Sequence, residues 1–511
     1  MISSTLRIAV LILSTVCALH AAPDVSNLNN CIKDVRKADI SPPIVPTFDS
    51  YTTNYAGLIT DLEAAAVNLP YVYQEAAAKP LIHFLQNLGE WKFLQIFNEN
   101  STDELSAVLQ QIIPDAVLCV LFHEGTFEVG VNAFQEIVSD LYDGFLSNEV
   151  RVSKQGGRPI EPPTYGVIPP LVKFGNAESG PYTWPCDATN QILGMHCAIV
   201  SLPPAQLKGG LIAWSCLGHE TGGHDVTHAD AGLLDELANK VYGAVLKKFK
   251  SKSLANYWAK CIDESAADVC GYLNMGPSLG IGLIGYFRAL GNGKLRSIGS
   301  KEDPHPIDLL RGYLAAAVVK RLNFSGAEAW SQVITKETSK DNDTLYLVDQ
   351  VGNYYRFPVS FEQAIASTDV VAQVIMQSKL STLQQHSLQE LQDWRDSDQK
   401  IVDNLAWTLK TNGQLSTNLQ GSGFYAAYVV ASATQAALER GANITKIFSE
   451  MQNFLATMHQ DNPTWSQAPT EEAVALLDQG LKGDKNRVGV PAPHYVFQKM
   501  PEVDILLVGQ I

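Results

Sequence analysis

Basic residues are scarce in this sequence and nowhere form a run. The 511 residues include 37 Lys and Arg against 53 Asp and Glu, so the formal net charge is −16. Because binding to nucleic acid or to an anionic membrane surface depends on clustered Lys and Arg, we expect neither as a partner. Repeats and low-complexity tracts are missing too. With 46% hydrophobic and 18% charged residues, the composition is typical of a folded globular protein.

Long apolar runs are absent beyond the N-terminus, which predicts no membrane span. At the N-terminus a single cation, Arg7, precedes an apolar run over residues 8–19 and then the small residue Ala21. This pattern is typical of a secretory signal peptide cut near Ala21. A signal anchor is the weaker alternative, because the apolar run is too short to cross a bilayer. We therefore expect residues 1–21 to be removed and the mature chain to be secreted or lumenal.

Cysteine is infrequent as well. One of the eight cysteines, Cys17, lies inside the expected signal peptide. The other seven are an odd number, so at least one thiol is free or pairs outside the chain. Cys186 and Cys197 flank an expected hairpin and form the favoured intrachain disulfide. Four asparagines stand in N-x-S/T sequences: Asn100, Asn323, Asn342 and Asn443. We expect them at the surface, where they would be glycosylation acceptors in a eukaryotic secretory route.

The pattern of apolar residues divides the mature chain into three regions. Residues 22–149 repeat apolar residues at helical spacing, and residues 321–511 are mainly helical as well. The core region, residues 150–320, begins with alternating apolar residues, proline and glycine, which predict strands and a hairpin. In that part, residues 195–201 are the expected edge strand. The sequence thus predicts an α+β fold, predominantly helical, with a small sheet next to a helix over residues 209–224.

The most informative segment runs over residues 214–237, WSCLGHETGGHDVTHADAGLLDEL. His219, His224 and His228 fall within ten residues, and Glu220 follows the first of them. Zinc takes neutral imidazole and carboxylate ligands, and a hydrolytic zinc site uses three protein ligands and leaves one position to water. The acidic segment DESAAD, residues 263–268, offers the carboxylate. The two segments together predict a zinc site with Glu220 free to act as a base.

The spacing of the first two histidines requires a distorted helix. Histidines four residues apart share one helix face, but His219 and His224 are five apart and would lie about 140° apart around an ideal helix. A π-bulge absorbs one extra residue and is frequent at functional sites. Gly222 and Gly223 lower the steric barrier to such a distortion. We therefore predict an i to i+5 irregularity near these glycines.

These two segments resemble the signature motifs of one peptidase family. Residues 219–224, HETGGH, resemble the HExxGH motif of the dipeptidyl peptidase III family of zinc peptidases, and DESAAD resembles its second motif, E-E-x-x-A-E/D. The resemblance implies that His219, His224 and Glu264 bind zinc and that Glu220 is the general base and proton shuttle. It covers two short segments only, with Asp263 in place of Glu, and members of that family are longer and typically intracellular. It therefore implies a zincin-type core with a glutamate as third ligand, not membership of the family.

The residues around the predicted ligands suggest further roles. Asp268 lies one helical turn beyond Glu264, where it can accept the second N–H of a ligand histidine and fix its tautomer. His228 is the alternative third ligand, four residues after His224. With Glu264 as the favoured ligand, His228 or Asp225 is expected in the second shell or in contact with substrate.

A zinc peptidase also needs a group that stabilises the oxyanion of the transition state. His305, Arg311 and Tyr313 are the nearest candidates, and the spacing His-Pro-x-x-x-x-Arg favours His305. The alternative is a helix-capping histidine with an arginine in a surface ion pair. His494-Tyr495 is a fainter candidate. His123-Glu124 repeats the His-Glu dyad, but no second histidine follows it, so we interpret it as structural.

Nucleophilic and phosphate-binding chemistry is less favoured. Cys216 lacks the surrounding pattern of a cysteine peptidase, and no glycine loop precedes a lysine as in a P-loop. The predicted function is that of a secreted zinc metallopeptidase, with its peptide or protein substrate held between the edge strand at 195–201 and the histidine-bearing helix. The alternative is a non-catalytic secreted protein that binds metal or a partner on the same scaffold. Neither substrate identity, endo- or exopeptidase action, nor oligomeric state follows from the sequence.

Overall fold

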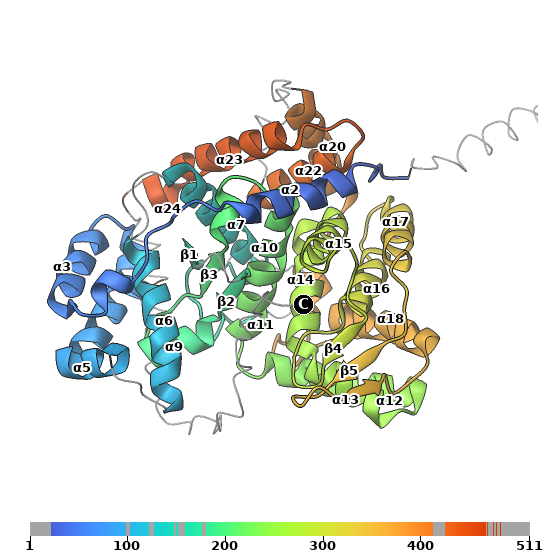
Figure 1. Cartoon of the computed structure of the whole chain (residues 1–511), viewed down its shortest axis with the longest axis horizontal. Helices are drawn as coiled ribbons and strands as arrows, with labels where there is room; N and C mark the ends of the chain where they lie inside the picture. Colours follow the sequence, from blue (N-terminus) through green and yellow to red (C-terminus); the bar gives the residue numbers. More distant parts are fainter. Residues whose placement is uncertain are drawn as a thin grey trace, which may run out of the picture.

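The computed structural model in Figure 1 is predominantly helical, with two small three-stranded sheets in its described part. The structure describes residues 22–98, 103–121, 127–147, 150–151, 159–175, 180–411 and 425–466, together with residues 468, 474, 477 and 481. The predicted α+β class with a helical majority is confirmed over these residues.

Helices fill the N-terminal region, as the apolar spacing predicts. In α3, Leu58, Leu62 and Ala66 form the buried side, and the Asn54 side chain caps the helix by accepting a hydrogen bond from the Gly57 N–H. The elements are α2 (Leu28–Ile40), η1 (Asp49–Tyr51), α3 (Tyr55–Ala66), α4 (Tyr71–Tyr73), η2 (Gln74–Ala78), α5 (Lys79–Asn98), α6 (Glu104–Leu121) and α7 (Glu128–Leu146). His123-Glu124 lies outside the described residues.

The first sheet follows these helices in the chain. Its strands are β1 (Leu171–Phe174), β2 (Tyr182–Trp184) and β3 (Ile199–Leu202), with helix α9 (Cys186–Leu193) between β2 and β3. Strand β3 pairs in parallel with β1 and antiparallel with β2, which gives the order β1-β3-β2. The predicted edge strand at 195–201 is therefore wrong, because its residues 199–201 belong to the central strand. All four residues of β3 are buried, as in a strand paired on both sides.

The predicted hairpin between Cys186 and Cys197 is wrong for a related reason. Cys186 begins α9, so the segment between the two cysteines is helical. The Cys186 thiol donates a hydrogen bond to the Asp225 carbonyl oxygen at 3.8 Å. All seven cysteines in the described part of the chain are free, buried thiols, and the predicted disulfide is not formed.

A segmented helix, residues 211–229, carries the three histidines and is called the metal helix below. It consists of a 3₁₀ turn η4 (Leu211–Ser215), α10 (Cys216–His219), a π-helical turn η5 (Glu220–Asp225) and α11 (Val226–Ala229), and a further 3₁₀ turn, η3 (Pro204–Leu207), precedes it. The helices that follow are α12 (Leu233–Phe249), α13 (Lys252–Lys260), α14 (Ile262–Met275) and α15 (Ser278–Leu290). The acidic segment thus begins a helix of its own, α14, which packs against α10 and η5.

The rest of the chain contributes a second small sheet and a set of helices. Strands β5 (Tyr346–Val348) and β6 (Tyr354–Arg356) form a hairpin, with Gly352 at a positive φ of 84° in its turn. The elements are β4 (Ile298–Ser300), α16 (Asp308–Val319), α17 (Ala327–Ser339), β5 (Tyr346–Val348), β6 (Tyr354–Arg356), α18 (Phe361–Gln377), α19 (Leu388–Leu391), α20 (Asp396–Thr411), α22 (Ala426–Leu438), α23 (Ile444–Asp461) and α24 (Pro463–Ser466).

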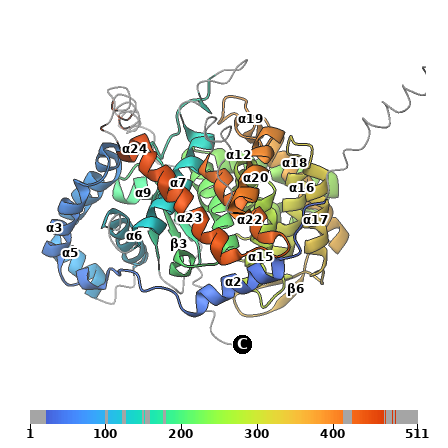
Figure 2. The same ribbon diagram turned by 90° about the horizontal axis from the view of Figure 1, so that it is seen from above.

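Segments from both ends of the chain enclose the metal helix. Helix α23 crosses the molecule in Figure 2 and packs against α7, and α22 packs against η4. Helix α2 lies beside α22 (Figure 1), where the Asn27 side chain donates a hydrogen bond to the Ala437 carbonyl at 2.8 Å. On the same helix, Asp34 Oδ2 accepts hydrogen bonds from the backbone N–H groups of Gly210 and Leu211, at the start of η4. One hydrophobic core spans all three predicted regions.

The surface agrees with the predicted acceptor positions. Asn323, Asn342 and Asn443 are exposed, and Asn100 lies outside the described residues. Among the described residues one helix, α6, is long and apolar enough to cross a membrane by length and composition alone, and 56% of its most apolar window is buried inside the fold.

Candidate metal centre

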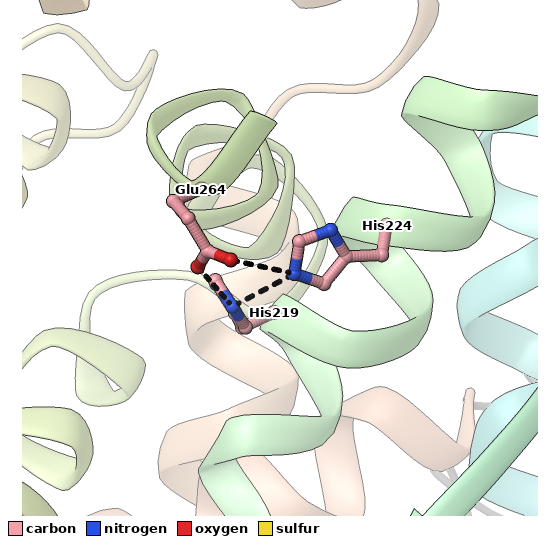
Figure 3. A group of neighbouring side chains, drawn as sticks. All are labelled: His219, His224 and Glu264. Carbon is pink, nitrogen blue, oxygen red and sulfur yellow. Dashed lines mark hydrogen bonds and ion pairs between the residues drawn. The ribbon is translucent and has the colours of Figure 1, made fainter. Parts of the chain in front are cut away.

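The π-helical turn η5 brings the first two histidines together. Over Glu220–Asp225 the metal helix has the wider π geometry, which confirms the irregularity predicted around Gly222 and Gly223. His219 ends α10 just before this turn, and His224 lies inside it. Their Nε2 atoms are 3.2 Å apart (Figure 3).

Glu264, in the first turn of α14, completes a group of three. Its Oε2 lies 3.1 Å from His219 Nε2, and its Oε1 lies 3.6 Å from His224 Nε2 (Figure 3). Ligand atoms of a tetrahedral zinc at 2.0–2.2 Å are roughly 3.3–3.6 Å from one another. The three predicted ligands thus converge, and these residues could hold a metal ion.

The hydrogen bonds behind the histidines favour a cation at this point. His219 Nδ1 lies 2.9 Å from Asp268 Oδ1, and His224 Nδ1 lies 3.0 Å from Asp263 Oδ1. Because a carboxylate only accepts, each Nδ1 carries a proton, so in the neutral form of each ring the lone pair of Nε2 points toward the other ring. Glu264 Oε2 also receives no well-aligned hydrogen bond from any described residue. Three electron-pair donors therefore face one another, an arrangement that a cation stabilises.

A proton shared among His219, His224 and Glu264 is the alternative to a metal ion. Burial lowers the pKa of His219, but its interactions with the carboxylates of Asp268 and Glu264 outweigh that effect and raise the pKa to about 10. The pKa of Glu264 is shifted well below its usual value, because nearby histidines outweigh the effect of burial. A metal ion must therefore displace a proton from this group.

Small residues let α14 approach the metal helix. A Cβ on Gly223 would lie 2.5 Å from Ala267 Cα, and a Cβ on Gly271 would lie 2.9 Å from the Gly218 carbonyl. Only glycine fits such contacts without displacing a backbone. Because Ala267 and Glu264 are three residues apart on one helix face, this close approach carries Glu264 toward the histidines.

Arg311 holds the carboxylate behind His219 rather than facing an open site. From α16, its Nε and Nη2 donate to the two oxygens of Asp268 at 2.9 and 2.8 Å, and Asp268 is fully buried. Burial raises the pKa of Asp268, but Arg311 and His219 lower it to about 2. Asp268 thus stays charged and orients His219, as predicted, and Arg311 fixes Asp268 in turn.

Of the other residues predicted to stabilise the oxyanion, His305 lies next to the three candidate ligands and Tyr313 does not. His305 Nε2 is 3.2 Å from Glu264 Oε1, and its side chain is 45% exposed, so this ring borders the three ligands from the solvent side. Its Nδ1 lies 2.6 Å from Asp303 Oδ1. Tyr313 donates its hydroxyl to Asn342 Oδ1, away from the ligands. His494-Tyr495 lies outside the described residues.

The alternative ligand His228 does not join the three. Its Nε2 lies 3.1 Å from Asp263 Oδ2 and its Nδ1 lies 3.1 Å from Asp187 Oδ2. Asp225 is fully buried, and neither of its carboxylate oxygens has a hydrogen-bond partner among the described residues. Glu264, not His228, is therefore the third member of the group around His219.

Glu220 lies at the start of η5 and is almost completely buried. The hydroxyl of Thr183, on the edge strand β2, donates to its Oε2 at 2.8 Å. No local pattern singles out Thr183 or Asp187, because both lie far from the histidines along the chain. The role of Asp263 could have been recognised, since it is the other acidic residue in the first turn of α14.

One further motif was overlooked in the sequence. Residues 276–280, Gly-Pro-Ser-Leu-Gly, match the G-x-S-x-G spacing of serine hydrolases. A nucleophile elbow follows a strand and exposes its serine, whereas Ser278 starts helix α15 after helix α14 and is 2% exposed. Cys216 is buried as well. Neither residue is placed to act as a nucleophile.

Comparison with known proteins adds no identification: no family model, no curated protein and no solved structure matches this chain. The assignment of the site therefore depends on its own geometry. His219, His224 and Glu264 form a buried group that could hold a metal ion.

Proposed function

We propose that this chain is a secreted zinc-dependent peptidase with a zincin-like core around the metal helix. The observation that carries the proposal is the convergence of His219, His224 and Glu264 next to a carboxylate, Glu220, that follows the first ligand in the chain. A purely structural ion has no use for a base at that position. An ion that activates water for hydrolysis needs such a base to accept the proton of that water.

The choice of zinc follows from the donor set. Two imidazole nitrogens and one carboxylate are the protein ligands of many hydrolytic zinc sites, and a structural site is usually closed by four protein ligands. Three converging ligands leave a position for water. Calcium and magnesium take oxygen ligands, so two imidazole nitrogens favour zinc over either of them.

Each remaining residue has a role in the proposed reaction. Bound zinc would polarise the carbonyl of a peptide bond and lower the pKa of a water molecule to about 7. Glu220 takes a proton from that water and passes it to the leaving amine. His305, at the solvent side of Glu264, donates a hydrogen bond to the carbonyl oxygen as negative charge develops there. Asp263 and Asp268 keep both ligand histidines in one tautomer.

Strand β2 is the substrate-binding edge in this proposal. It pairs with β3 on one side only among the described strands, and it contacts η5. An extended peptide that pairs with a free strand edge gains main-chain hydrogen bonds irrespective of its sequence. A substrate on β2 would lie beside the strand whose Thr183 contacts Glu220.

Metal analysis of the purified protein, followed by peptide hydrolysis by wild type and Glu220→Gln, tests the proposal. We expect one zinc per chain in both proteins, hydrolysis of a peptide library by wild type, and a loss of at least about 100-fold in the variant. Zinc retained without turnover of any peptide would support the alternative, a non-catalytic metal-binding protein. No bound metal would overturn both.

Secretion is tested separately, because residues 1–21 lie outside the described part of the chain. Expression of the full-length sequence in a eukaryotic secretory cell line should release protein into the medium. Its N-terminal residue should lie close to Ala22. Retention of the chain with Met1 intact would contradict the predicted signal peptide.

A further inference from the structure

We propose that Asp187 and His228 are positioning residues for the ligand His224, acting through Asp263, so that metal affinity depends on helix α9. The inference rests on the metal site of the proposed function but not on peptidase activity. Both residues lie outside the three ligands, and each is expected to strengthen metal binding.

The four side chains form one continuous hydrogen-bonded chain. Asp187, on α9, accepts from His228 Nδ1 at 3.1 Å, and His228 Nε2 donates to Asp263 Oδ2 at 3.1 Å. The other oxygen of Asp263, Oδ1, accepts from His224 Nδ1 at 3.0 Å. The chain ends at His224 Nε2, which faces His219 and Glu264.

Asp263 is fixed at both oxygens by this arrangement. A carboxylate held by one hydrogen bond can rotate about its side-chain torsions, whereas one held at both oxygens keeps its plane. Apart from the histidines, the only hydrogen bond to the Asp263 carboxylate from a described residue comes from the Thr227 hydroxyl, at 3.4 Å. His228 is therefore the main constraint on Asp263, and Asp263 is the constraint on the His224 ring. Partners of this kind behind a ligand histidine are known to govern metal affinity.

His228 donates from both ring nitrogens, because each faces a carboxylate oxygen. A protonated ring between two carboxylates joins α9 to α14 across the metal helix. Neither carboxylate can replace the other, since they approach opposite sides of the ring. Loss of Asp187 would remove one anchor and leave His228 free to turn away from Asp263.

A second cation site is the competing explanation, because ligand atoms of His224, His228 and Asp263 also lie within 4.8 Å of one another. The contacts of 3.0 and 3.1 Å between these nitrogens and Asp263 are already those of direct hydrogen bonds. A second ion would also have to displace the Nδ1 proton of His224, whose Nε2 serves the first group. We therefore expect one ion per chain.

The test measures the affinity for zinc alone, by competition with a chromophoric chelator. His228→Phe keeps a ring and removes both donors, and Asp187→Asn removes the charge that holds Nδ1. We expect each to weaken zinc binding about 10-fold, the lower end of the usual effect of such partners. His228→Gln can still donate to Asp263 and should recover part of the loss. His83→Gln, an exposed histidine on α5, is the control and should bind zinc like wild type.

Two further measurements separate positioning from a general loss of stability. The visible absorption of the cobalt-loaded protein reports ligand geometry and should change in His228→Phe but not in His83→Gln. The double variant Asp187→Asn with His228→Phe should bind zinc no more weakly than His228→Phe alone, because the two residues act in series. Thermal unfolding of the metal-free proteins checks that each variant is folded.

Zinc affinity, the number of bound ions and peptide hydrolysis together distinguish the possible outcomes. Zinc affinities of folded His228→Phe and Asp187→Asn within about twofold of wild type would overturn it, and so would two ions per chain in wild type. If wild type binds one zinc, the variants weaken it, and no peptide is hydrolysed, the inference stands and the proposed peptidase fails. If wild type binds no metal, both fail together.

Discussion

The Thr183 hydroxyl donates a hydrogen bond of 2.8 Å to Glu220 Oε2 and so links the edge strand of the sheet to the carboxylate beside the first ligand. This contact crosses between β2 and η5 and fixes one oxygen of the proposed base.

Thr183→Val removes this donor while keeping the shape of the side chain. Because a hydrogen bond to a charged group contributes about 1.5–3 kcal/mol, we expect kcat/KM for peptide hydrolysis to fall about 10-fold or more. Zinc content should be unchanged, since Thr183 contacts none of the three ligands. Thr183→Ser retains the hydroxyl and is the matched control. A Val variant as active as the Ser variant would contradict the proposed contribution of this contact.

The paired glycines of η5 should respond very differently to alanine. In Gly223→Ala the new Cβ would lie 2.5 Å from Ala267 Cα, so α14 must move away and take Glu264 with it. We expect destabilisation by about 1–3 kcal/mol, as for overpacked cores, together with weaker metal binding. In Gly222→Ala the nearest atom is 3.6 Å away, and stability should be unchanged or slightly higher. Denaturant unfolding and zinc titration of both variants test this contrast.

Arg311→Met should leave the buried carboxylate of Asp268 without its cation. Removal of one partner of a buried ion pair costs about 3–5 kcal/mol, because the remaining charge is uncompensated. The free energy of unfolding should fall by that amount at neutral pH. The double variant Arg311→Met with Asp268→Asn should regain part of it, because the unpaired charge is then absent. An equal loss in the single and double variants would show that only packing is involved.

Asp225 predicts a pH dependence of stability that is independent of the reaction. Burial raises its pKa to about 7, from an ordinary value of 3.8, so the folded chain binds a proton there that the unfolded chain has already released. Stability from this group is therefore present at low pH and declines as the pH rises from about 4 to 7.

The variant Asp225→Asn removes this titration. It should be more stable than wild type above pH 7, by at most about 4 kcal/mol, and the advantage should shrink toward pH 4. Thermal unfolding of the metal-free proteins between pH 4 and 8 measures the difference. A constant difference at every pH would contradict the raised pKa.

Local patterns in the sequence predicted the distorted turn and the convergence of His219, His224 and Glu264, because both depend on spacing within short segments. His219 and His224 could share an ion only if the helix gained a residue per turn, and η5 has that geometry. The role of Asp268 followed from helix periodicity in the same way.

What could not be predicted depends on tertiary contacts. The run around Ile199–Leu202 is compatible with an edge or a central strand, and only its pairing with both β1 and β2 decides between them. Thr183 reaches Glu220 from β2 and Asp187 reaches His228 from α9, and no local pattern contains the positions of these two elements. Arg311 could be named from its spacing but not placed, because its partner Asp268 lies on another helix.

Helix α2 has a consequence for the order in which the site is completed. Asn27 bonds to Ala437, 410 residues further along the chain, and on the same helix Asp34 caps the start of the metal helix. Helix α2 can therefore dock fully only after α22 has been synthesised. We expect the metal helix to reach its final form, and to acquire metal, late in folding rather than as soon as residues 211–229 have been made.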